Sequence, residues 1–419
     1  MRCYFYQGMT NLLSKEEKNE DEILTIISDK IESLLDLKNV NFLFGSGTSA
    51  KACPLMADLY TNFKKELASD KYIDQERSLI AGIKDNGNIE DLLGVLYSLK
   101  AFVNNYKKDL ENERDGKQQD TEFDVGTLIN KIENYIYDQL NVLSTNASGE
   151  DITGEVKSVL ELYKCFYQKV ALRNKDLSRL NVFTTNNDLF NETALDALNI
   201  HYINGFTGGL TKYFNPAIFN YTMSKRYDSS VNKYEPVENM VYLYKLHGSI
   251  NWIEEEKSVN RYFTIREIPA QKDKPQSPVM IYPTPIKQNK SLGAPYVDLF
   301  REFQHKLLEP NSVLFVLGYS FSDEHINDII YRALATNSTL TLVVINRLDE
   351  SKTICTIDDS RIFRIWSDEA GENFNNNIYL FRNFIQKLLP VNKIQTEESE
   401  LQSFIEQYNE NRKNSSRRV

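Results

Sequence analysis

The chain has 419 residues, of which 41 % are hydrophobic and 26 % are charged, and its net charge is −10. This composition excludes a wholly disordered chain, and the acidic balance argues against broad, nonspecific binding to nucleic acid. No run approaches the roughly 20 apolar residues of a membrane helix, and the first residues lack the order of a signal peptide. We therefore expect a cytoplasmic protein that binds neither membrane nor nucleic acid directly.

Seven short apolar runs predict the strands of a sheet. In chain order they are VNFLFGSG (40–47), LNVFTTNND (180–188), IHYINGF (200–206), YLYKLHGS (242–249), VMIYPTP (279–285), SVLFVLGYS (312–320) and LTLVVIN (340–346). Many are apolar almost throughout, which is typical of parallel strands that are covered on both faces. Helical stretches separate them, such as the one that follows Ser322, a predicted N-cap. The alternation predicts an α/β fold with a Rossmann-like, doubly wound, mainly parallel sheet.

A long stretch without a clear strand interrupts this alternation between about residues 55 and 179. Apolar residues at helical spacing predict helices within it, one through Leu59 and Phe63 and another around Ile132. We interpret the stretch as a large helical insertion after the first strand. Residues 107–124 inside it are too polar to pack and predict a loop.

The predicted domain division follows from these boundaries. Residues 1–54 and 180–370 form the Rossmann-like domain, residues 55–179 form the helical insertion, and residues 371–419 form C-terminal helices with a basic tail. The two terminal helices are expected at 378–389 and 401–408. Segment 208–239 is rich in Tyr and Asn and has no clear period, and one hypothesis is that it closes over a site as a lid.

Small residues follow the first predicted strand, at the sheet edge where ligands bind in α/β proteins. Gly45 and Gly47 would let the backbone approach a phosphate, and a following helix would supply N–H groups and a positive dipole. Tight turns between a strand and a helix also use glycine, so both interpretations stay open.

Polar residues follow the second predicted strand. Asp188 could simply cap a helix that starts at Leu189. That interpretation does not account for Asn186, whose side chain could hold a water molecule or a sugar hydroxyl.

His247 ends the run YLYKLHGS, and Gly248 removes side-chain bulk beside its ring. An imidazole, with an ordinary pKa of about 6.5, is suited to accepting a proton near neutrality. A histidine at a strand end can equally be a structural residue. The other histidines, His201, His305 and His325, lack comparable surroundings.

Taken together and in this order, these segments resemble the sirtuin-like family of NAD-consuming domains. The motifs that carry the resemblance are GSGTS (45–49), TTNND (184–188), KLHGS (245–249), GYS (318–320) and IN (345–346). The resemblance implies that NAD⁺ is bound as a substrate, and it assigns a role to each motif. Gly45, Ser46, Gly47, Thr48 and Ser49 would line the phosphates, Thr185 would also contact the dinucleotide, Asn186 and Asp188 would lie at the nicotinamide ribose, His247 would be the base, and Gly318, Ser320 and Asn346 would hold the adenosine half. Asn186, Asp188 and His247 are thus the candidate catalytic residues.

Two departures set the chain apart from protein-deacylating sirtuins. Its cysteines, Cys3, Cys53, Cys165 and Cys355, are isolated in the sequence, so the four-cysteine zinc module is missing and we predict no metal. The helical insertion is similar to that of bacterial anti-phage members, which resemble hydrolases that cleave NAD⁺ to nicotinamide and ADP-ribose. The partners implied are further copies of the chain and a HerA-type hexameric ATPase.

Three alternatives to a hydrolase stay open. The missing zinc cysteines argue against a deacylase, and the lack of a paired-carboxylate motif for two metals argues against a nuclease or DNA-processing subunit. A catalytically silent module that senses NAD⁺ or ADP-ribose would need neither Asn186 nor His247, and the chain has both.

Overall fold

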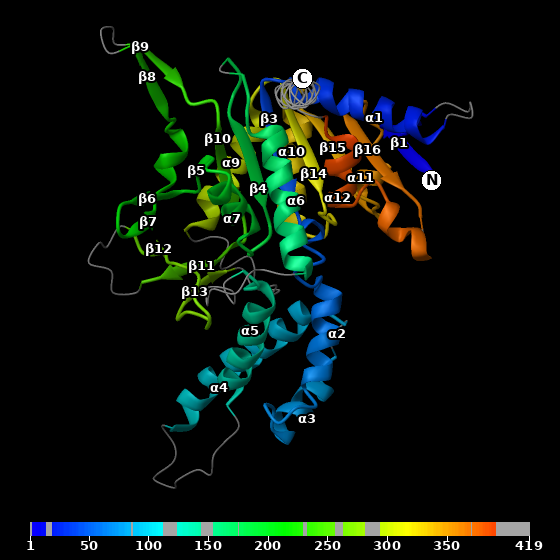
Figure 1. Ribbon diagram of the computed structural model, residues 1–419. Helices are drawn as coiled ribbons and strands as arrows, with labels where there is room; N and C mark the ends of the chain where they lie inside the picture. The colour runs from blue at the N-terminus through cyan, green and yellow to red at the C-terminus, as the bar shows by residue number, and fades with distance from the viewer. Residues whose placement is uncertain are drawn as a thin grey trace, which may run out of the picture.

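A nine-stranded sheet runs through the larger part of the molecule (Figure 1). The computed structural model describes residues 2–13, 19–84, 87–111, 124–143, 154–174, 176–228, 233–255, 263–280, 294–369 and 371–390. In their order across the sheet, the strands are β2 (Thr10–Asn11), β1 (Cys3–Gln7), β16 (Ile362–Ser367), β15 (Thr341–Ile345), β14 (Ser312–Leu317), β3 (Asn39–Phe44), β4 (Leu180–Thr184), β10 (Met240–Lys245) and β5 (His201–Ile203). From β16 to β5 every neighbouring pair is parallel, whereas β1 pairs with β16 and β2 in antiparallel fashion. The predicted α/β fold with a mainly parallel sheet is confirmed.

Successive residues of a strand point to opposite sides of a sheet, so the apolar strands present buried side chains on both faces. Helices cover each of these faces. Phe42 and Phe44 pack on one face and Leu43 on the other. The first face is covered by α1 (Glu20–Leu35), α6 (Gly154–Val170), α7 (Phe190–Ala197), α12 (Phe381–Asn383) and the π-turn η5 (Phe384–Leu388). The second face is covered by α9 (Tyr296–Leu308), α10 (Glu324–Thr336) and the short α11 (Thr353–Thr356). The result is the three-layer arrangement of a Rossmann-like fold.

The sheet register aligns the strand ends that carry the sequence motifs. Phe44 lies opposite Thr184 on one side and Leu317 on the other. Thr184 in turn pairs with Lys245, and Leu317 pairs with Ile345. Since these five strands are parallel, the residues that follow them all emerge at one edge, called here the carboxyl edge.

A second, antiparallel sheet stands below the first and was not predicted. Its strands, in order, are β13 (Pro278–Met280), β11 (Gly248–Glu254), β12 (Ile265–Glu267), β7 (Lys212–Phe214) and β6 (Phe206–Gly208). Two predicted strands are therefore divided between the sheets. Residues 200–206 contribute to β5 and β6, and residues 242–249 contribute to β10 and β11, with His247 in the turn between them. Of the predicted strand 279–285, the part after Met280 lies outside the described residues.

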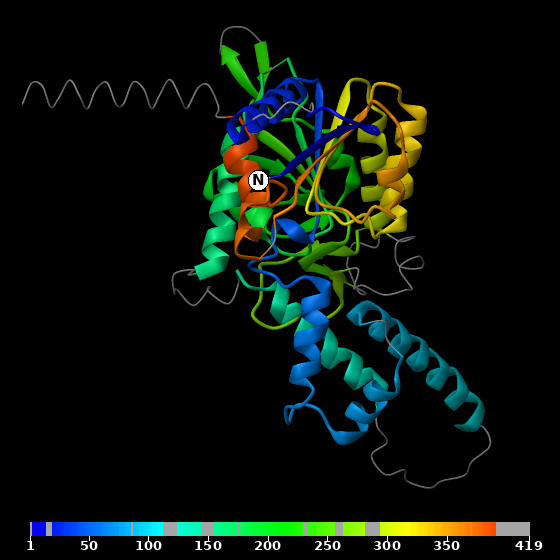
Figure 2. The same ribbon diagram turned by 90° about the vertical axis from the view of Figure 1, so that its right-hand side faces the viewer.

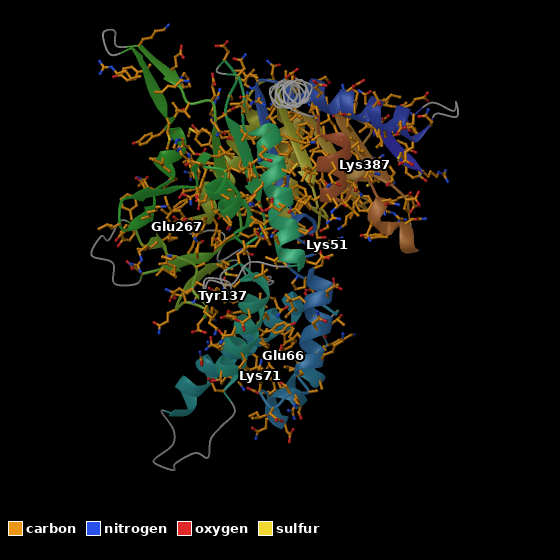
Figure 3. All side chains as sticks on the ribbon, in the orientation of Figure 1. Lys51, Glu66, Lys71, Tyr137, Glu267 and Lys387 are labelled. Atoms are coloured by element: carbon orange, nitrogen blue, oxygen red, sulfur yellow. The ribbon has the colours of Figure 1, made fainter. Side chains whose placement is uncertain are left out.

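A group of helices with a core of its own stands away from the sheet (Figure 2). It consists of α2 (Met56–Glu66), α3 (Asp74–Gly82), α4 (Ile89–Glu111) and α5 (Val125–Leu140), and is called here the helical region. Its core also includes Leu189, Ile250 and Met280, which belong to the sheet-bearing part. The hydroxyl of Tyr137, labelled in Figure 3, donates to the Gln271 carbonyl oxygen at 2.9 Å across this junction.

The helical region begins close to the predicted start of the insertion, at Met56, but differs from the prediction in the strands that precede it and in its end. Two strands, β1 and β2, precede β3, so the region follows the third strand along the chain rather than the first. Helix α6, which falls within the predicted range 55–179, packs in the core against β3 and β4 instead of with α2 to α5. Most of the predicted loop 107–124 lies outside the described residues.

The segment 208–239 divides into parts with different positions. After β7 comes a 3₁₀ turn, η3 (Pro216–Asn220), and then a hairpin of β8 (Ser224–Asp228) and β9 (Lys233–Pro236). Because β9 leads directly into the first residue of β10, this hairpin lies at the opposite end of the sheet from the carboxyl edge (Figure 1). The hairpin therefore does not cover that edge.

The C-terminal part begins as predicted with helical turns in the run 378–389, formed by α12 and η5. The predicted helix 401–408 and the basic tail lie outside the described residues. Among the helices that the structure describes, none combines the length and the apolar character needed to cross a membrane.

Candidate functional site

The turn after β3 packs directly against the turn after β14. The Gly45 N–H donates to the Leu317 carbonyl oxygen and the Gly47 N–H to the Gly318 carbonyl oxygen, both at 2.9 Å. A Cβ on Gly45 would lie 2.5 Å from the Gly318 oxygen, and a Cβ on Gly318 would lie 2.6 Å from the Thr48 nitrogen. These glycines therefore allow two backbones to touch at the point where the strand order reverses, which is where α/β sheets bind ligands.

The anion-binding helix N-terminus expected after Gly47 is not formed. Ser46–Thr48 make a single 3₁₀ turn, and the next α-helix begins only at Met56. The turn also uses its own N–H groups, since Thr48 donates to the Gly45 oxygen at 3.0 Å and Ser49 to the Ser46 oxygen at 3.1 Å. Phosphate recognition through a helix dipole is thus absent from this turn.

Four polar side chains meet behind this turn. The hydroxyl of Tyr163, from α6, lies 2.8 Å from Thr48 Oγ1 and 3.0 Å from Ser49 Oγ. The Asn186 carboxamide nitrogen donates to the same two oxygens, at 3.1 and 3.2 Å. All four residues are buried, so the bonds fix the Asn186 side chain. Its carboxamide oxygen accepts no hydrogen bond from the described residues and is the atom that can hold a water molecule.

Asp188 lies deeper than Asn186, with 2 % of its surface exposed. Burial raises the pKa of its carboxyl, against the opposing effects of the Lys245 charge, the Ser49 hydroxyl and the Phe190 N–H. The Phe190 N–H, at the first turn of α7, lies 3.2 Å from Asp188 Oδ1. These contacts support the start of α7 and the Ser49 side chain, and the expected role of Asp188 at the nicotinamide ribose stays a prediction.

Thr185 opens the same turn and is half-buried. Its N–H donates to the Phe44 carbonyl oxygen at 3.0 Å, which continues the pairing of β4 with β3 beyond the strand end. The neighbouring Asn186 N–H donates to Thr184 Oγ1 at 3.0 Å. The turn that carries Asn186 is therefore tightly held on both sides.

His247 occupies the turn between β10 and β11 and is 13 % exposed. Its Nε2 lies 3.1 Å from Asp323 Oδ2. When Nε2 carries the proton, the carboxylate fixes that tautomer and leaves Nδ1 with its lone pair, and Nδ1 has no partner among the described residues. This arrangement is suited to general-base chemistry.

Asp323, which sequence analysis missed, both caps α10 and contacts His247. Its Oδ1 accepts from the His325 N–H at 3.0 Å, so Asp323 rather than the predicted Ser322 is the N-cap of α10. Its other carboxylate oxygen faces His247. The sequence around Ser322 could not show that Asp323 reaches His247, which lies 76 positions earlier in the chain. Tyr163 was also missed, because it comes from a helix that the sequence analysis assigned to the insertion.

The ends of β14 and β15 supply the remaining candidate residues. Asn346 Nδ2 donates to the Tyr319 carbonyl oxygen at 3.0 Å, which ties the two ends together. Ser320 is exposed, and its hydroxyl donates to Ser322 Oγ at 3.0 Å. Ser46 is also exposed. Neither hydroxyl has a described contact with the Asn186 cluster, and both residues are exposed at this edge.

The carboxyl edge holds no cluster suited to a metal. In the part of the chain that the structure describes, no group of three or more His, Cys, Asp or Glu side chains is placed to bind one. The groups that the described residues offer there include hydroxyls, carboxamides, the imidazole–carboxylate pair of His247 and Asp323, and the buried carboxyl of Asp188. A surface hollow between α6 and the terminal helices, lined in part by Cys165 and Arg382, includes none of these residues.

Comparison with known proteins bears on the strands of this edge other than β3. No curated protein matches the chain. Residues 180–354, which contain β4, β10, β14 and β15 and the ends that follow them, match the family model of the SIR2-like domain. SIR2-like domains bind NAD⁺, and the match supports a sirtuin-like family for this part of the chain and an activity related to NAD.

Proposed function

We propose that the chain is an NAD⁺ glycohydrolase that cleaves NAD⁺ to nicotinamide and ADP-ribose. The observation that carries the proposal is the meeting of all five motif-bearing strand ends at one carboxyl edge, with Asn186 and His247 following the paired strands β4 and β10. The SIR2-like match supports NAD⁺ as the ligand.

The residues at this edge account for the chemistry of such a cleavage. Breaking the bond between nicotinamide and ribose passes through an oxocarbenium-like state, which requires a held ribose and a water nucleophile. The Asn186 carboxamide oxygen would orient the water, because its nitrogen is already fixed by Thr48 and Ser49. His247 Nδ1 would accept the proton as the water attacks, and Asp323 would stabilise the resulting imidazolium. No step requires a metal.

The cellular role is part of the same proposal. A chain that hydrolyses NAD⁺ in the cytoplasm must be restrained until needed, and we propose that it acts in anti-phage defence by NAD⁺ depletion, as an oligomer controlled by a HerA-type ATPase. The resemblance of the ordered motifs supports this role. A catalytically silent NAD⁺ sensor is the alternative that the same site geometry could serve.

Nicotinamide release by the purified chain tests the proposal, with and without a candidate ATPase. We expect His247→Ala and Asn186→Ala to lower the rate by about 10²- to 10⁴-fold, which is the range for a lost general base or an unpositioned nucleophile. His201→Ala is the matched control, since His201 is exposed on β5. Bound but uncleaved NAD⁺ under all conditions would instead identify a sensor.

A further inference from the structure

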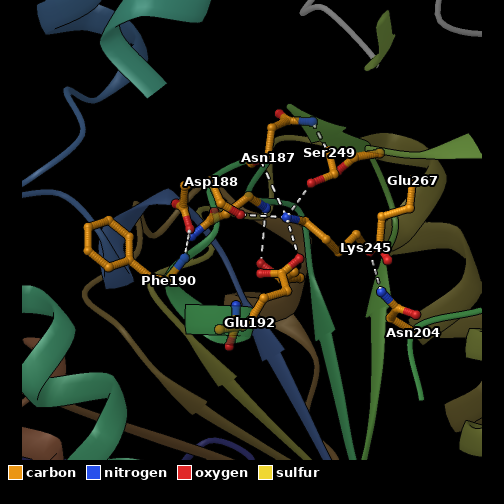
Figure 4. A network of polar contacts seen from close by, with 12 residues as sticks. Asn187, Asp188, Phe190, Glu192, Asn204, Lys245, Ser249 and Glu267 are labelled. Atoms are coloured by element: carbon orange, nitrogen blue, oxygen red, sulfur yellow. Dashed lines mark hydrogen bonds and ion pairs between the residues drawn. The ribbon is translucent and has the colours of Figure 1, made fainter. Parts of the chain in front are cut away.

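Lys245, the last residue of β10, is a buried cation at the carboxyl edge, on the side of β4 and β10. Its side chain is 0 % exposed, and its ammonium lies 2.9 Å from Glu192 Oε1 on α7. It also donates to Ser249 Oγ at 2.7 Å and to the Asp188 carbonyl oxygen. A fourth contact reaches the Asn187 carbonyl oxygen at 3.4 Å (Figure 4).

These acceptors lie on both turns that carry the candidate catalytic residues. Asn187 and Asp188 follow Asn186 in the turn after β4, whereas Ser249 follows His247 after the turn between β10 and β11. The ammonium therefore spans the gap between the two turns. Figure 4 shows it between the Asn187 and Asp188 side and Ser249, with Glu192 below in this view.

Direct contacts between the turns accompany this link. Asn187 Nδ2 donates to the His247 carbonyl oxygen at 2.8 Å, and the Ile250 N–H donates to the Asn187 carbonyl oxygen at 3.1 Å. Asn187 can make both bonds only while its own backbone is held in place, and its carbonyl oxygen is shared with the Lys245 ammonium. Lys245 thus supports a residue that directly joins the His247 turn to the Asn186 turn.

We propose that Lys245 is a positioning residue that sets the separation of Asn186 and His247. The inference rests on the proposed hydrolase function of the same site. Lys245 does not touch the reacting atoms, and its effect passes through Asn187, Asp188 and Ser249. A misplacement of about 1 Å in such a site lowers a rate by about 10²-fold.

A purely structural ion pair is the competing explanation, and it makes a different prediction. Buried ion pairs can often be replaced by apolar residues of similar volume without loss of stability. Glu192 is consistent in part with a purely structural ion pair, because its Oε2 has no hydrogen-bond partner among the described residues. An apolar pair would fill the space but could not bond to the Asn187 and Asp188 carbonyl oxygens.

The test is the double variant Lys245→Met/Glu192→Leu, compared with Lys131→Met/Glu76→Leu, which removes a pair in the helical region whose atoms lie 2.8 Å apart. We expect the first to keep its melting temperature near that of the second, yet to lose about 10²-fold in kcat with little change in KM for NAD⁺. Amide hydrogen exchange should accelerate in residues 184–190 and 245–251 only.

Each result of these measurements either supports or overturns the positioning role of Lys245. Wild-type kcat and unchanged local exchange in a folded double variant would overturn the positioning role. If the wild-type chain itself releases no nicotinamide, the proposed hydrolase function fails. The positioning role of Lys245 is then tested by amide hydrogen exchange in residues 184–190 and 245–251 alone. If the double variant does not fold, Ser249→Ala removes one contact of the ammonium without changing charge. A wild-type kcat in that variant would equally overturn the proposal.

Discussion

Gly318 shows why small residues are required at a strand end beside the switch point. Its φ of +63° lies in the left-handed region, and a Cβ there would lie within 2.8 Å of the Gly47 backbone. Both the backbone conformation and the close approach exclude a side chain. The requirement comes from packing between the β3 and β14 turns, and any ligand would bind against that packed surface.

Gly318→Ala should therefore destabilise the chain more than Gly371→Ala. Gly371 has nearly the same φ, +62°, but its Cβ would meet nothing within 4 Å. The unfolding free energy of Gly371→Ala should fall only by the cost of placing an alanine in the left-handed conformation, about 1 kcal/mol. Gly318→Ala adds a backbone overlap to that cost. Urea unfolding measures the stability of both variants. Equal losses of unfolding free energy would show that the β3 and β14 turns separate easily.

The pairing of His247 with Asp323 links the candidate base to a helix N-cap. One carboxylate oxygen caps α10 and the other faces the imidazole, so the rigid start of a helix orients the ring. An amide at this position would keep the cap, because Asn caps helices as well as Asp does. The atom that faces His247 would then be a carboxamide NH2, which removes both the negative charge and the acceptor for the Nε2 proton.

Asp323→Asn is expected to lower nicotinamide release by up to about 10²-fold, less than the loss of the base itself. Its unfolding free energy should stay within about 0.5 kcal/mol of the wild type, because the cap is retained. Asp124→Asn is the control, since Asp124 caps α5 and faces no histidine. Full activity in Asp323→Asn would mean that His247 acts without a carboxylate partner.

Among the elements, most of the parallel strands were predicted, although β16 was missed, and the antiparallel strands were predicted only where the runs 200–206, 242–249 and 279–285 reach into them. Strands such as β3 and β14 are buried at every position, which produces the continuous apolar runs seen in the sequence. By contrast, β1 alternates between buried and half-buried residues, and β12 and β13 are three residues long. Such short strands form because tertiary pairing holds them, and their local sequence carries little signal.

The junction of the helical region depends on a buried ion pair. Lys274 Nζ lies 2.6 Å from Glu133 Oε2 on α5, and the two side chains are only 12 % and 8 % exposed. The Tyr97 hydroxyl also donates to Glu133. Removing one partner of such a pair leaves a charge buried without compensation.

Lys274→Met should therefore cost about 3 kcal/mol of unfolding free energy. Lys71→Met removes an exposed pair with Glu66, both labelled in Figure 3, and should cost less than about 1 kcal/mol. Limited proteolysis should show earlier cleavage within residues 263–280 in Lys274→Met alone. Equal stability of the two variants would mean that the apolar contacts of α5 hold the junction unaided.

At the scale of the whole molecule, the order of the motifs predicted their common edge. Five strand ends spread over some three hundred residues of sequence converge because their strands are parallel neighbours. What the sequence could not show is the partners that approach from outside those motifs. Tyr163 and Asp323 contribute through side-chain contacts with residues distant in sequence. Lys245 lies inside the KLHGS motif, but its ion pair with Glu192 could not be read from that motif either. The predicted roles of the site residues toward NAD⁺ stay predictions.

Binding of the dinucleotide across this edge should stabilise the whole chain, because both halves of the sheet would contact one ligand. A ligand at 100 times its Kd adds about 2.7 kcal/mol to the unfolding free energy. We expect His247→Ala, which should bind NAD⁺ without cleaving it, to show a melting temperature that rises with NAD⁺ concentration. ADP-ribose should act similarly, and nicotinamide alone should have little effect.

The companion variant for this measurement is Asn346→Ala in the His247→Ala background. Asn346 ties the β15 end to the β14 turn through the Tyr319 carbonyl oxygen, on the side expected to hold the adenosine half. Its loss should weaken the stabilisation by NAD⁺ and by ADP-ribose to the same extent, because both ligands contain adenosine. If only NAD⁺ binding weakened, the dinucleotide would lie in the reverse orientation, with nicotinamide at β15. If neither ligand raised the melting temperature, the carboxyl edge would not be a dinucleotide site in the isolated chain.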